Sequence, residues 1–323
     1  MTVSEHVDQK RAPMELKAQK KICAELDTIP SQSMLDPFKL TITLTENPKK
    51  VLPAEELVFG KTFTDKLLTF HLSFLISCVF HYAFECFEGM KAYKDNNGKN
   101  RLFRPDRNMQ RLNKSTSRIA LPTVDEGALI KLIGEFVKVE NRLIPQKRGC
   151  SLYLRPTVIG TQESLGVGAP TSALLFVIAS PVGPYYPTGF KAISLEATNY
   201  AARAWPGGVG DKKLGANYAP CVAPQREAAS RGFQQNLSLF GEDEYVTEVG
   251  TMNLFIALKG KDGQKELITA PIDGTILEGV TRDTLLQLAR ERLVPQGWAV
   301  SERKLRMQQI SEAAEDGRPY NVK

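Results

Sequence analysis

The sequence predicts an α+β protein of two domains, and its length, its hydrophobic patterns and one turn-rich stretch support this prediction. A chain of 323 residues exceeds what one ordinary hydrophobic core holds together. Strand-like and helix-like patterns both occur, and a stretch rich in proline and glycine interrupts them. We expect an N-terminal α/β domain over 1–182, with 1–35 disordered, a linker over 183–193, and a β-rich C-terminal domain over 194–323.

Three stretches of the first domain have strand patterns. Apolar and polar residues alternate over 38–44, which predicts a half-buried strand. Residues 151–158 also resemble a strand, and the continuous apolar run 173–179 predicts a strand buried on both faces. The sequence Asn96-Asn-Gly98 predicts a hairpin turn.

Two helices are predicted in the first domain. Residues 105–118 begin with a proline, which suits the first turn of a helix. Thr123 and Glu126 have the spacing of a capping box. The helix that follows carries an apolar stripe at helical spacing, formed by Leu129, Leu132, Ile133 and Phe136.

The second domain alternates strands and helices. The patterns predict strands over 192–197, 237–240 and 254–258, a helix over 218–230 that ends at Gly232, and a helix from Val280 to about residue 293.

Composition and charge argue against several classes of protein. A net charge of +6 without a block of lysine and arginine gives no reason to expect a nucleic-acid partner. Five scattered cysteines and three histidines do not form a metal-ligand pattern, so we expect no metal. The N-terminus lacks the apolar core of a secretory signal, and the longest apolar run is too short for a membrane span. We expect a cytoplasmic protein, since acids interrupt the N-terminus more than a mitochondrial presequence allows.

One segment, Arg203-Ala-Trp-Pro-Gly-Gly-Val-Gly-Asp-Lys-Lys-Leu-Gly-Ala-Asn-Tyr218, combines flexible backbone with a lysine pair. Glycines allow tight turns and close approach of backbone to a ligand. A lysine in such a setting, followed by a phenol at Tyr218, suits imine formation with an aldehyde cofactor. The alternative is a solvated basic loop, because most lysines are exposed. The spacing does not match a phosphate-binding P-loop.

This segment resembles the cofactor-lysine region of branched-chain amino-acid aminotransferases, which are pyridoxal 5'-phosphate enzymes of fold type IV. Three further motifs follow the family order: His81-Tyr-Ala-Phe-Glu-Cys-Phe-Glu-Gly-Met-Lys-Ala-Tyr93, Val246-Thr-Glu-Val-Gly-Thr-Met-Asn253 and Asp273-Gly-Thr-Ile-Leu-Glu-Gly-Val-Thr-Arg282. The resemblance covers about 36–318 and implies the two-domain α+β fold of fold type IV.

The resemblance also implies a role for individual residues. Lys213 would bind pyridoxal 5'-phosphate as an imine and then move the α-proton of the substrate. The other cofactor-binding residues would be Arg111, Tyr218, Glu248, Val280 and Thr281, and the substrate-binding residues Tyr82, Phe87, Tyr153, Arg155, Tyr185 and Thr251. The reaction implied is transfer of the amino group of leucine, isoleucine or valine to 2-oxoglutarate by a homodimer.

Some of these residues have independent explanations. An arginine in an apolar strand, such as Arg155, is costly to bury without an anion, which a substrate carboxylate or a structural acid would supply. Arg111 would otherwise form a surface salt bridge, and Phe87 would be an ordinary core aromatic. Val280 lies at the start of a predicted helix, and its motif could be an ordinary helix start without a ligand. A helix N-terminus also suits a phosphate.

The resemblance is interrupted at 66–78 and does not extend past Gly317. We interpret the interruption as a deletion, or as a gene-model error in which an intron boundary was misplaced, and the end of the resemblance as a truncated C-terminus. We expect low or no activity from the chain as written. An alternative is an inactive paralogue or truncated product with a non-catalytic role. A second alternative is a related D-amino-acid aminotransferase or aminodeoxychorismate lyase.

Overall fold

The computed structural model describes residues 52–57, 68–69, 76–184 and 191–319. The strand expected at 38–44, the disorder expected over 1–35 and the candidate residue Tyr185 lie outside these ranges. Within the described ranges the chain has both helices and mixed sheets, which confirms the α+β fold class.

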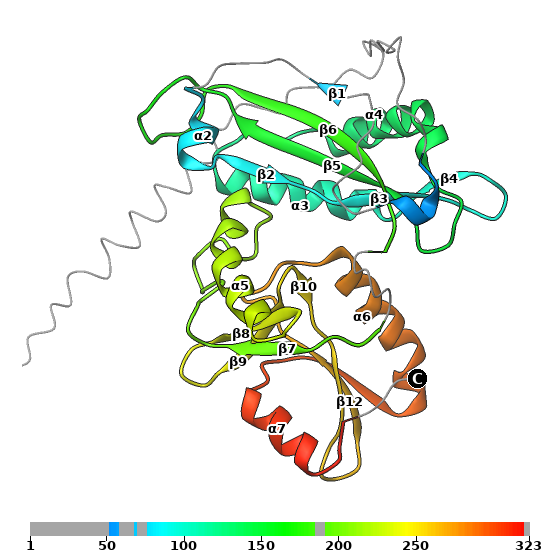
Figure 1. Cartoon of the computed structure of the whole chain (residues 1–323), viewed down its shortest axis with the longest axis vertical. Helices are drawn as coiled ribbons and strands as arrows, with labels where there is room; N and C mark the ends of the chain where they lie inside the picture. Colours follow the sequence, from blue (N-terminus) through cyan, green and yellow to red (C-terminus); the bar gives the residue numbers. More distant parts are fainter. Residues whose placement is uncertain (1–51, 58–67, 70–75, 185–190, 320–323) are drawn as a thin grey trace, which may run out of the picture.

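The first half of the chain forms a six-stranded antiparallel sheet (Figure 1). Its strands run in the order β1-β6-β5-β3-β4, and β2 also pairs with β5. The central pair, β5 and β6, stays in register over ten residues, from Ser151 opposite Val182 to Gly160 opposite Ala173. The strands are β1 (Leu68–Thr69), β2 (Glu85–Phe87), β3 (Met90–Lys94), β4 (Asn100–Leu102), β5 (Ser151–Gly160) and β6 (Ala173–Val182).

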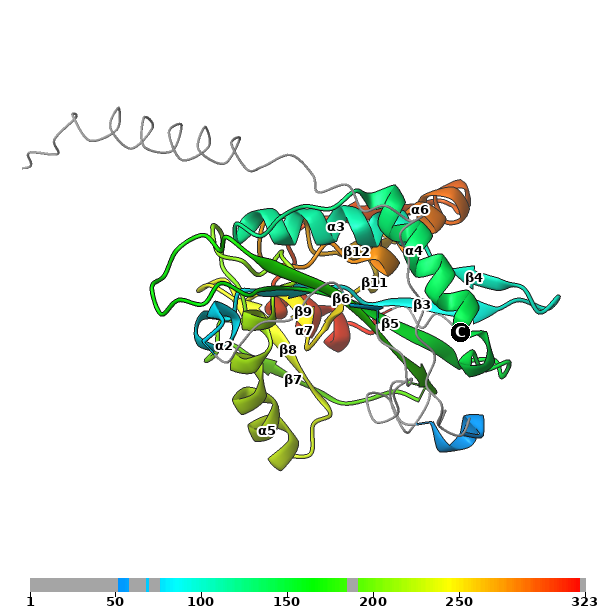
Figure 2. The same ribbon diagram turned by 90° about the horizontal axis from the view of Figure 1, so that it is seen from above.

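Two helices cover one face of this sheet (Figure 2). They are α3 (Pro105–Arg118) and α4 (Glu126–Val139), both at the positions that the sequence predicts. All four residues of the predicted apolar stripe on α4 are buried, as is Met109 on α3. The first hydrophobic core therefore lies between these helices and the sheet, and it fixes α3 relative to β2 and β3.

The second half of the chain contains two smaller sheets and three longer helices. A four-stranded sheet has the order β10-β9-β8-β7, and a three-stranded sheet has the order β11-β12-β13. The strands are β7 (Leu195–Thr198), β8 (Gln235–Phe240), β9 (Tyr245–Val249), β10 (Met252–Asn253), β11 (Ile256–Lys259), β12 (Lys265–Thr269) and β13 (Trp298–Glu302). The helices are α5 (Val222–Ser230), α6 (Val280–Arg292) and α7 (Met307–Glu315).

Short helices complete the described chain: α2 (Cys78–Tyr82) and the 3-10 turns η2 (Ala54–Glu56), η3 (Asn141–Leu143), η4 (Gly215–Asn217), η5 (Ala219–Cys221) and η6 (Val294–Gln296). No helix within the described ranges is long and apolar enough to cross a lipid bilayer.

Several local expectations were wrong. Residues 78–82 form the short helix α2, which was not predicted and which ends where Ala83 adopts a left-handed φ of 53°. The N-cap of α4 is Asp125, whose carboxylate accepts from the Ala128 amide at 2.6 Å, so Thr123 is not the cap. The helix α7 was not predicted at all.

Candidate active site

The lysine segment runs as an irregular loop between β7 and η4. Two positions in this loop require glycine, each for a different reason. Gly207 has a left-handed φ of 81°, which residues with a Cβ rarely adopt. Gly210 allows close approach, because a Cβ there would lie 2.1 Å from the Cβ of Ala204. The loop therefore needs glycine at both positions to take this path.

Both halves of the molecule hold the backbone of Lys213. Its amide donates to Oγ of Ser115 on α3 at 3.0 Å, and its carbonyl accepts from the amide of Phe87 at 3.0 Å. The Asn217 side chain donates to the carbonyls of Val209 and Lys212, each at 2.8 Å. The lysine is thus fixed at the place where the first sheet meets the second half of the chain.

The Lys213 amine lies among aromatic rings. Nζ donates to the Tyr218 hydroxyl at 3.0 Å and lies 4.9 Å from the centre of the Phe87 ring. Burial lowers the pKa of Lys213 to about 8; the charges of Arg111 and Arg155 also lower it, and Glu88 and Glu248 oppose the shift. About a tenth of this amine is therefore uncharged, and nucleophilic, at pH 7, far more than for a solvated lysine.

Tyr218 links the lysine to the surrounding groups. Its ring packs against that of Phe87 with centroids 5.0 Å apart. Burial raises the pKa of the Tyr218 hydroxyl to about 12, although Arg203 and Arg111 lower it. The phenol therefore stays protonated at neutral pH and remains a hydrogen-bond donor.

Glu248 on β9 is almost completely buried, and three groups of the chain bind its carboxylate. Its Oε2 lies 2.8 Å from Nη2 of Arg203, and its Oε1 accepts from Asn253 at 2.9 Å and from the Leu277 amide. Burial raises the pKa of Glu248, while Arg203, the Leu277 amide and Lys213 lower it. Glu248 in turn raises the pKa of Lys213, so these two groups are close enough to influence each other.

Arg111 on α3 is buried and ion-paired. Its Nε and Nη2 bind the two oxygens of Glu88 at 2.7 and 2.8 Å. Its remaining nitrogen, Nη1, donates to the carbonyl of Glu278 at 2.8 Å. The arginine therefore does not form the surface salt bridge that was the alternative explanation for it.

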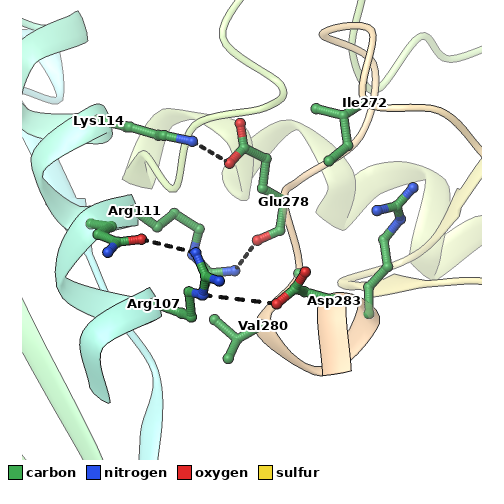
Figure 3. A pocket seen from close by; sticks show the side chains of 10 residues that line it. Arg107, Arg111, Lys114, Ile272, Glu278, Val280 and Asp283 are labelled. Atoms are coloured by element: carbon green, nitrogen blue, oxygen red, sulfur yellow. Dashed lines mark hydrogen bonds and ion pairs between the residues drawn. The ribbon is translucent and has the colours of Figure 1, made fainter. Parts of the chain in front are cut away.

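Arg111 and Val280 line a cavity of about 130 Å³ where α3 faces the start of α6 (Figure 3). Arg107 and Lys114 line it from α3, and Glu278 and Asp283 line it from the opposite side. Gly279 is the N-cap of α6 and no side chain caps it, which leaves backbone amides at the start of the helix. Thr281, the next residue, is exposed. This end of the site has the charges and donors that an anion needs.

A larger cavity of about 570 Å³ lies beside Tyr218 and Thr251, within the second half of the chain. Its lining is mostly apolar, and its volume falls in the range of small-molecule sites. Arg203 also lines it, and within the described ranges Nη1 of this buried arginine has no hydrogen-bond partner. An unsatisfied buried donor at the wall of a cavity indicates room for an acceptor from a ligand.

A second aromatic-cationic group lies on the sheet next to the lysine. The guanidinium carbon of Arg155 is 4.3 Å from the centre of the Phe87 ring. Nε and Nη2 of Arg155 donate to the Tyr153 hydroxyl at 3.0 and 2.9 Å. Burial raises the pKa of Tyr153, against Arg155, which lowers it. The Phe87 ring thus lies near both the Arg155 guanidinium and the Lys213 amine.

The structure brings most of the predicted site residues together around Phe87 and Lys213. Tyr82 lies earlier in the chain, at the end of α2; its side chain is exposed, and its hydroxyl donates to the Leu165 carbonyl. The sequence did not single out several residues that hold the site in place: Glu88, Asn108, Ser115, Arg203, Asn217 and Asn253. Four of them lie inside the motifs quoted above, whereas only the fold brings Asn108 and Ser115 to the site.

Comparison with known proteins identifies the class of enzyme. The model of the family Amino-transferase class IV matches residues 85–315. This chain therefore belongs to the class IV aminotransferase family.

Its relatives within the family carry a more particular name. The mitochondrial branched-chain-amino-acid aminotransferase of Saccharomyces cerevisiae is 56% identical over 309 residues, which are 90% of this chain and 79% of the relative. The cytosolic enzyme of the same yeast is 56% identical over 302 residues, 88% of this chain and 80% of the relative. The chain is thus also a member of the branched-chain aminotransferase group of this family.

Solved structures agree on the fold. A branched-chain aminotransferase from Thermoproteus uzoniensis aligns with a TM-score of 0.64 at 24% identity, covering 77% of this chain and 80% of that one. The Escherichia coli branched-chain aminotransferase aligns with a TM-score of 0.63 at 25% identity, covering 76% and 79%. Both support the two-part architecture described above.

Proposed function

We propose that this chain transfers the amino group of leucine, isoleucine or valine to 2-oxoglutarate, with pyridoxal 5'-phosphate as its cofactor. The observation that carries the proposal is the Lys213 amine, whose pKa is about 8 and which lies against Tyr218 and under the electrostatic influence of Glu248. The yeast relatives at 56% identity, both named branched-chain-amino-acid aminotransferases, support the choice of substrate.

The chemistry of the donor set fits this cofactor. An aldehyde needs an uncharged amine, a protonated pyridine nitrogen needs an anion, and a phosphate monoester needs a cation and backbone amides. Lys213, Glu248 and Arg111 with the start of α6 supply these groups in turn. The bound cofactor would serve as an electron sink that makes the α-proton of the amino acid acidic.

The residues of the chain would then divide the remaining work. Lys213, once the incoming amino acid has displaced it from the cofactor, would take the α-proton. It would then deliver this proton to the cofactor carbon that had carried the aldehyde. Tyr218 would donate its hydroxyl to the ring oxygen of the cofactor, and Glu248 would hold the pyridine nitrogen protonated. Val280 and Thr281 would offer backbone amides to the phosphate.

The substrate would lie over Phe87. Arg155, which Tyr153 orients through its hydroxyl, would hold a carboxylate, and Phe87 would contact the apolar side chain. Thr251 lines the larger cavity and would bind the α-carboxylate. Tyr82 would line the pocket for the apolar side chain together with Phe87, and Tyr185 would close the pocket.

Three further proposals concern organisation. We propose a first domain over 1–182 and a second over 194–323, joined by 183–193, because the sheets divide between 182 and 195. We also propose a homodimer, which sedimentation of the purified chain would test. Finally, we propose a cytoplasmic location; the two yeast relatives are named mitochondrial and cytosolic, so imaging of a tagged chain is the direct test.

A single-turnover experiment tests the reaction. The cofactor-loaded chain is mixed with one equivalent of L-leucine, and loss of the aldehyde absorbance is followed together with release of the 2-oxo acid. Addition of 2-oxoglutarate should restore the absorbance and produce glutamate. Conversion of D-leucine in place of L-leucine would contradict the proposal and favour a D-amino-acid aminotransferase.

A further inference from the structure

Glu88 is a buried carboxylate to which no role in the reaction has been given above. It follows β2 directly and is completely inaccessible to solvent. Its amide donates to the Pro156 carbonyl on β5 at 2.7 Å, so the central sheet fixes its backbone. A buried carboxylate is costly unless cations and donors surround it, and the surroundings of Glu88 therefore need an explanation.

Four hydrogen bonds converge on the Glu88 carboxylate. Arg111 contributes two, from Nε at 2.7 Å and Nη2 at 2.8 Å. Nδ2 of Asn108 donates to Oε2 at 2.7 Å, and the Gly89 amide donates to the same oxygen at 3.2 Å. The parallel pair of bonds to Arg111 fixes both the position and the plane of the guanidinium.

This arrangement leaves Nη1, which Glu88 does not bind, directed at the start of α6. Nη1 points to the Glu278 carbonyl, one residue before the N-cap of α6, and Arg111 lines the cavity shown in Figure 3. Arginine has a long and flexible side chain, and fixing its orientation removes entropy that a ligand would otherwise have to remove.

We propose that Glu88 is a positioning residue, which holds Arg111 in the orientation that receives the cofactor phosphate beside the start of α6. The inference rests on the function proposed above. Glu88 would act through Arg111, to which its carboxylate is bonded.

Glu88 has a second, electrostatic effect on the same site. Its negative charge raises the pKa of Lys213, whereas the positive charge of Arg111 lowers it. The ion pair therefore places a strong phosphate ligand near the lysine while part of its electrostatic effect on the amine is cancelled.

Comparison of pyridoxal 5'-phosphate with pyridoxal, which lacks the phosphate, isolates this role. Both aldehydes are titrated into the apoprotein, and Kd is read from the absorbance of the lysine-bound form. In Glu88→Gln we expect pyridoxal 5'-phosphate to bind about tenfold or more weakly, since hydrogen bonds to charged groups are among the strongest. The Kd for pyridoxal should change little. Glu88→Asp keeps the negative charge and should recover part of the lost affinity for pyridoxal 5'-phosphate.

Glu140 offers a matched control. It lies at the end of α4 in the same half of the chain and is as completely buried as Glu88. Glu140→Gln should alter stability and leave the ratio of the two dissociation constants unchanged. If Glu88→Gln weakens both aldehydes equally, or neither, Glu88 does not position Arg111. If the unmodified chain binds neither aldehyde covalently, the proposed function fails first.

Discussion

Arg203 and Glu248 form an ion pair across two elements of the second half, with Nη2 of the arginine 2.8 Å from Oε2 of the glutamate. Both side chains are more than nine-tenths buried. Burial raises the pKa of Glu248, and Arg203 is the strongest influence that lowers it. The pair therefore opposes the loss of negative charge that burial favours, at the residue proposed to face the pyridine nitrogen of the cofactor.

Removing the cation should make stability depend on pH. In Arg203→Met the buried carboxylate loses its main partner, which typically costs about 3–5 kcal/mol. The folded-state pKa of Glu248 then rises further above its unfolded value of about 4.3. The free energy of unfolding should therefore fall as pH rises above about 4, because ionisation becomes costly only in the folded state.

Urea unfolding of Arg203→Met from about pH 4 to pH 8 checks this. The double variant Arg203→Met with Glu248→Gln is the control, and it should lose the added pH dependence. A single variant whose stability is independent of pH would contradict the importance of the pair.

The low pKa of Lys213 should be visible in the kinetics of cofactor capture. Burial and two arginines lower this pKa from 10.5 to about 8. Because the neutral amine is the nucleophile, the rate of capture by the apoprotein should rise about tenfold per pH unit below 8 and level off above it. Stopped-flow absorbance measures the rate, with free N-acetyl-lysine for comparison. A rate that keeps rising to about pH 10 would indicate a solvated lysine.

Replacing Lys213 and Lys212 one at a time should show which of the two lysines binds the cofactor. Lys213→Ala should abolish turnover and covalent binding of pyridoxal 5'-phosphate. Lys212 is the matched control, because its amine pairs with Asp211 beside it. Lys212→Ala should retain covalent binding within a few-fold. Retention of turnover in Lys213→Ala would exclude the assigned role.

The path of the lysine loop should depend on Gly210. A Cβ at this position would lie 2.1 Å from the Cβ of Ala204, so Gly210→Ala forces the loop apart and should cost about 1–3 kcal/mol. Gly134 on α4 has no atom within 4 Å of an added Cβ. Gly134→Ala should instead stabilise the chain by about 0.5–1 kcal/mol. Urea unfolding of both variants measures the difference, and equal effects would contradict it.

Local patterns predicted the elements better than they predicted the contacts between them. The helix 105–118 was predicted with its observed bounds, and a proline marks its start. The cap of α4 was misplaced by two residues, because Thr123 and Asp125 are both good cap residues and only the three-dimensional path chooses between them.

For the site too, local patterns predicted individual residues better than the contacts between them. Glu88 and Arg111 are 23 residues apart, and their pairing depends on how α3 packs on the sheet, which no local pattern specifies. Lys213, Tyr218 and Glu248 were predicted from their motifs, and the structure places the Lys213 amine beside the Tyr218 hydroxyl. The partner of Glu248, Arg203, begins the quoted lysine motif, but its role appeared only from the fold.

The most direct test of the central claim is to find where the cofactor binds. The chain is incubated with pyridoxal 5'-phosphate, reduced with borohydride, digested and sequenced by mass spectrometry. We expect the phosphopyridoxyl group on Lys213. Labelling confined to Lys212 or to surface lysines, with Lys213 unmodified, would contradict the account.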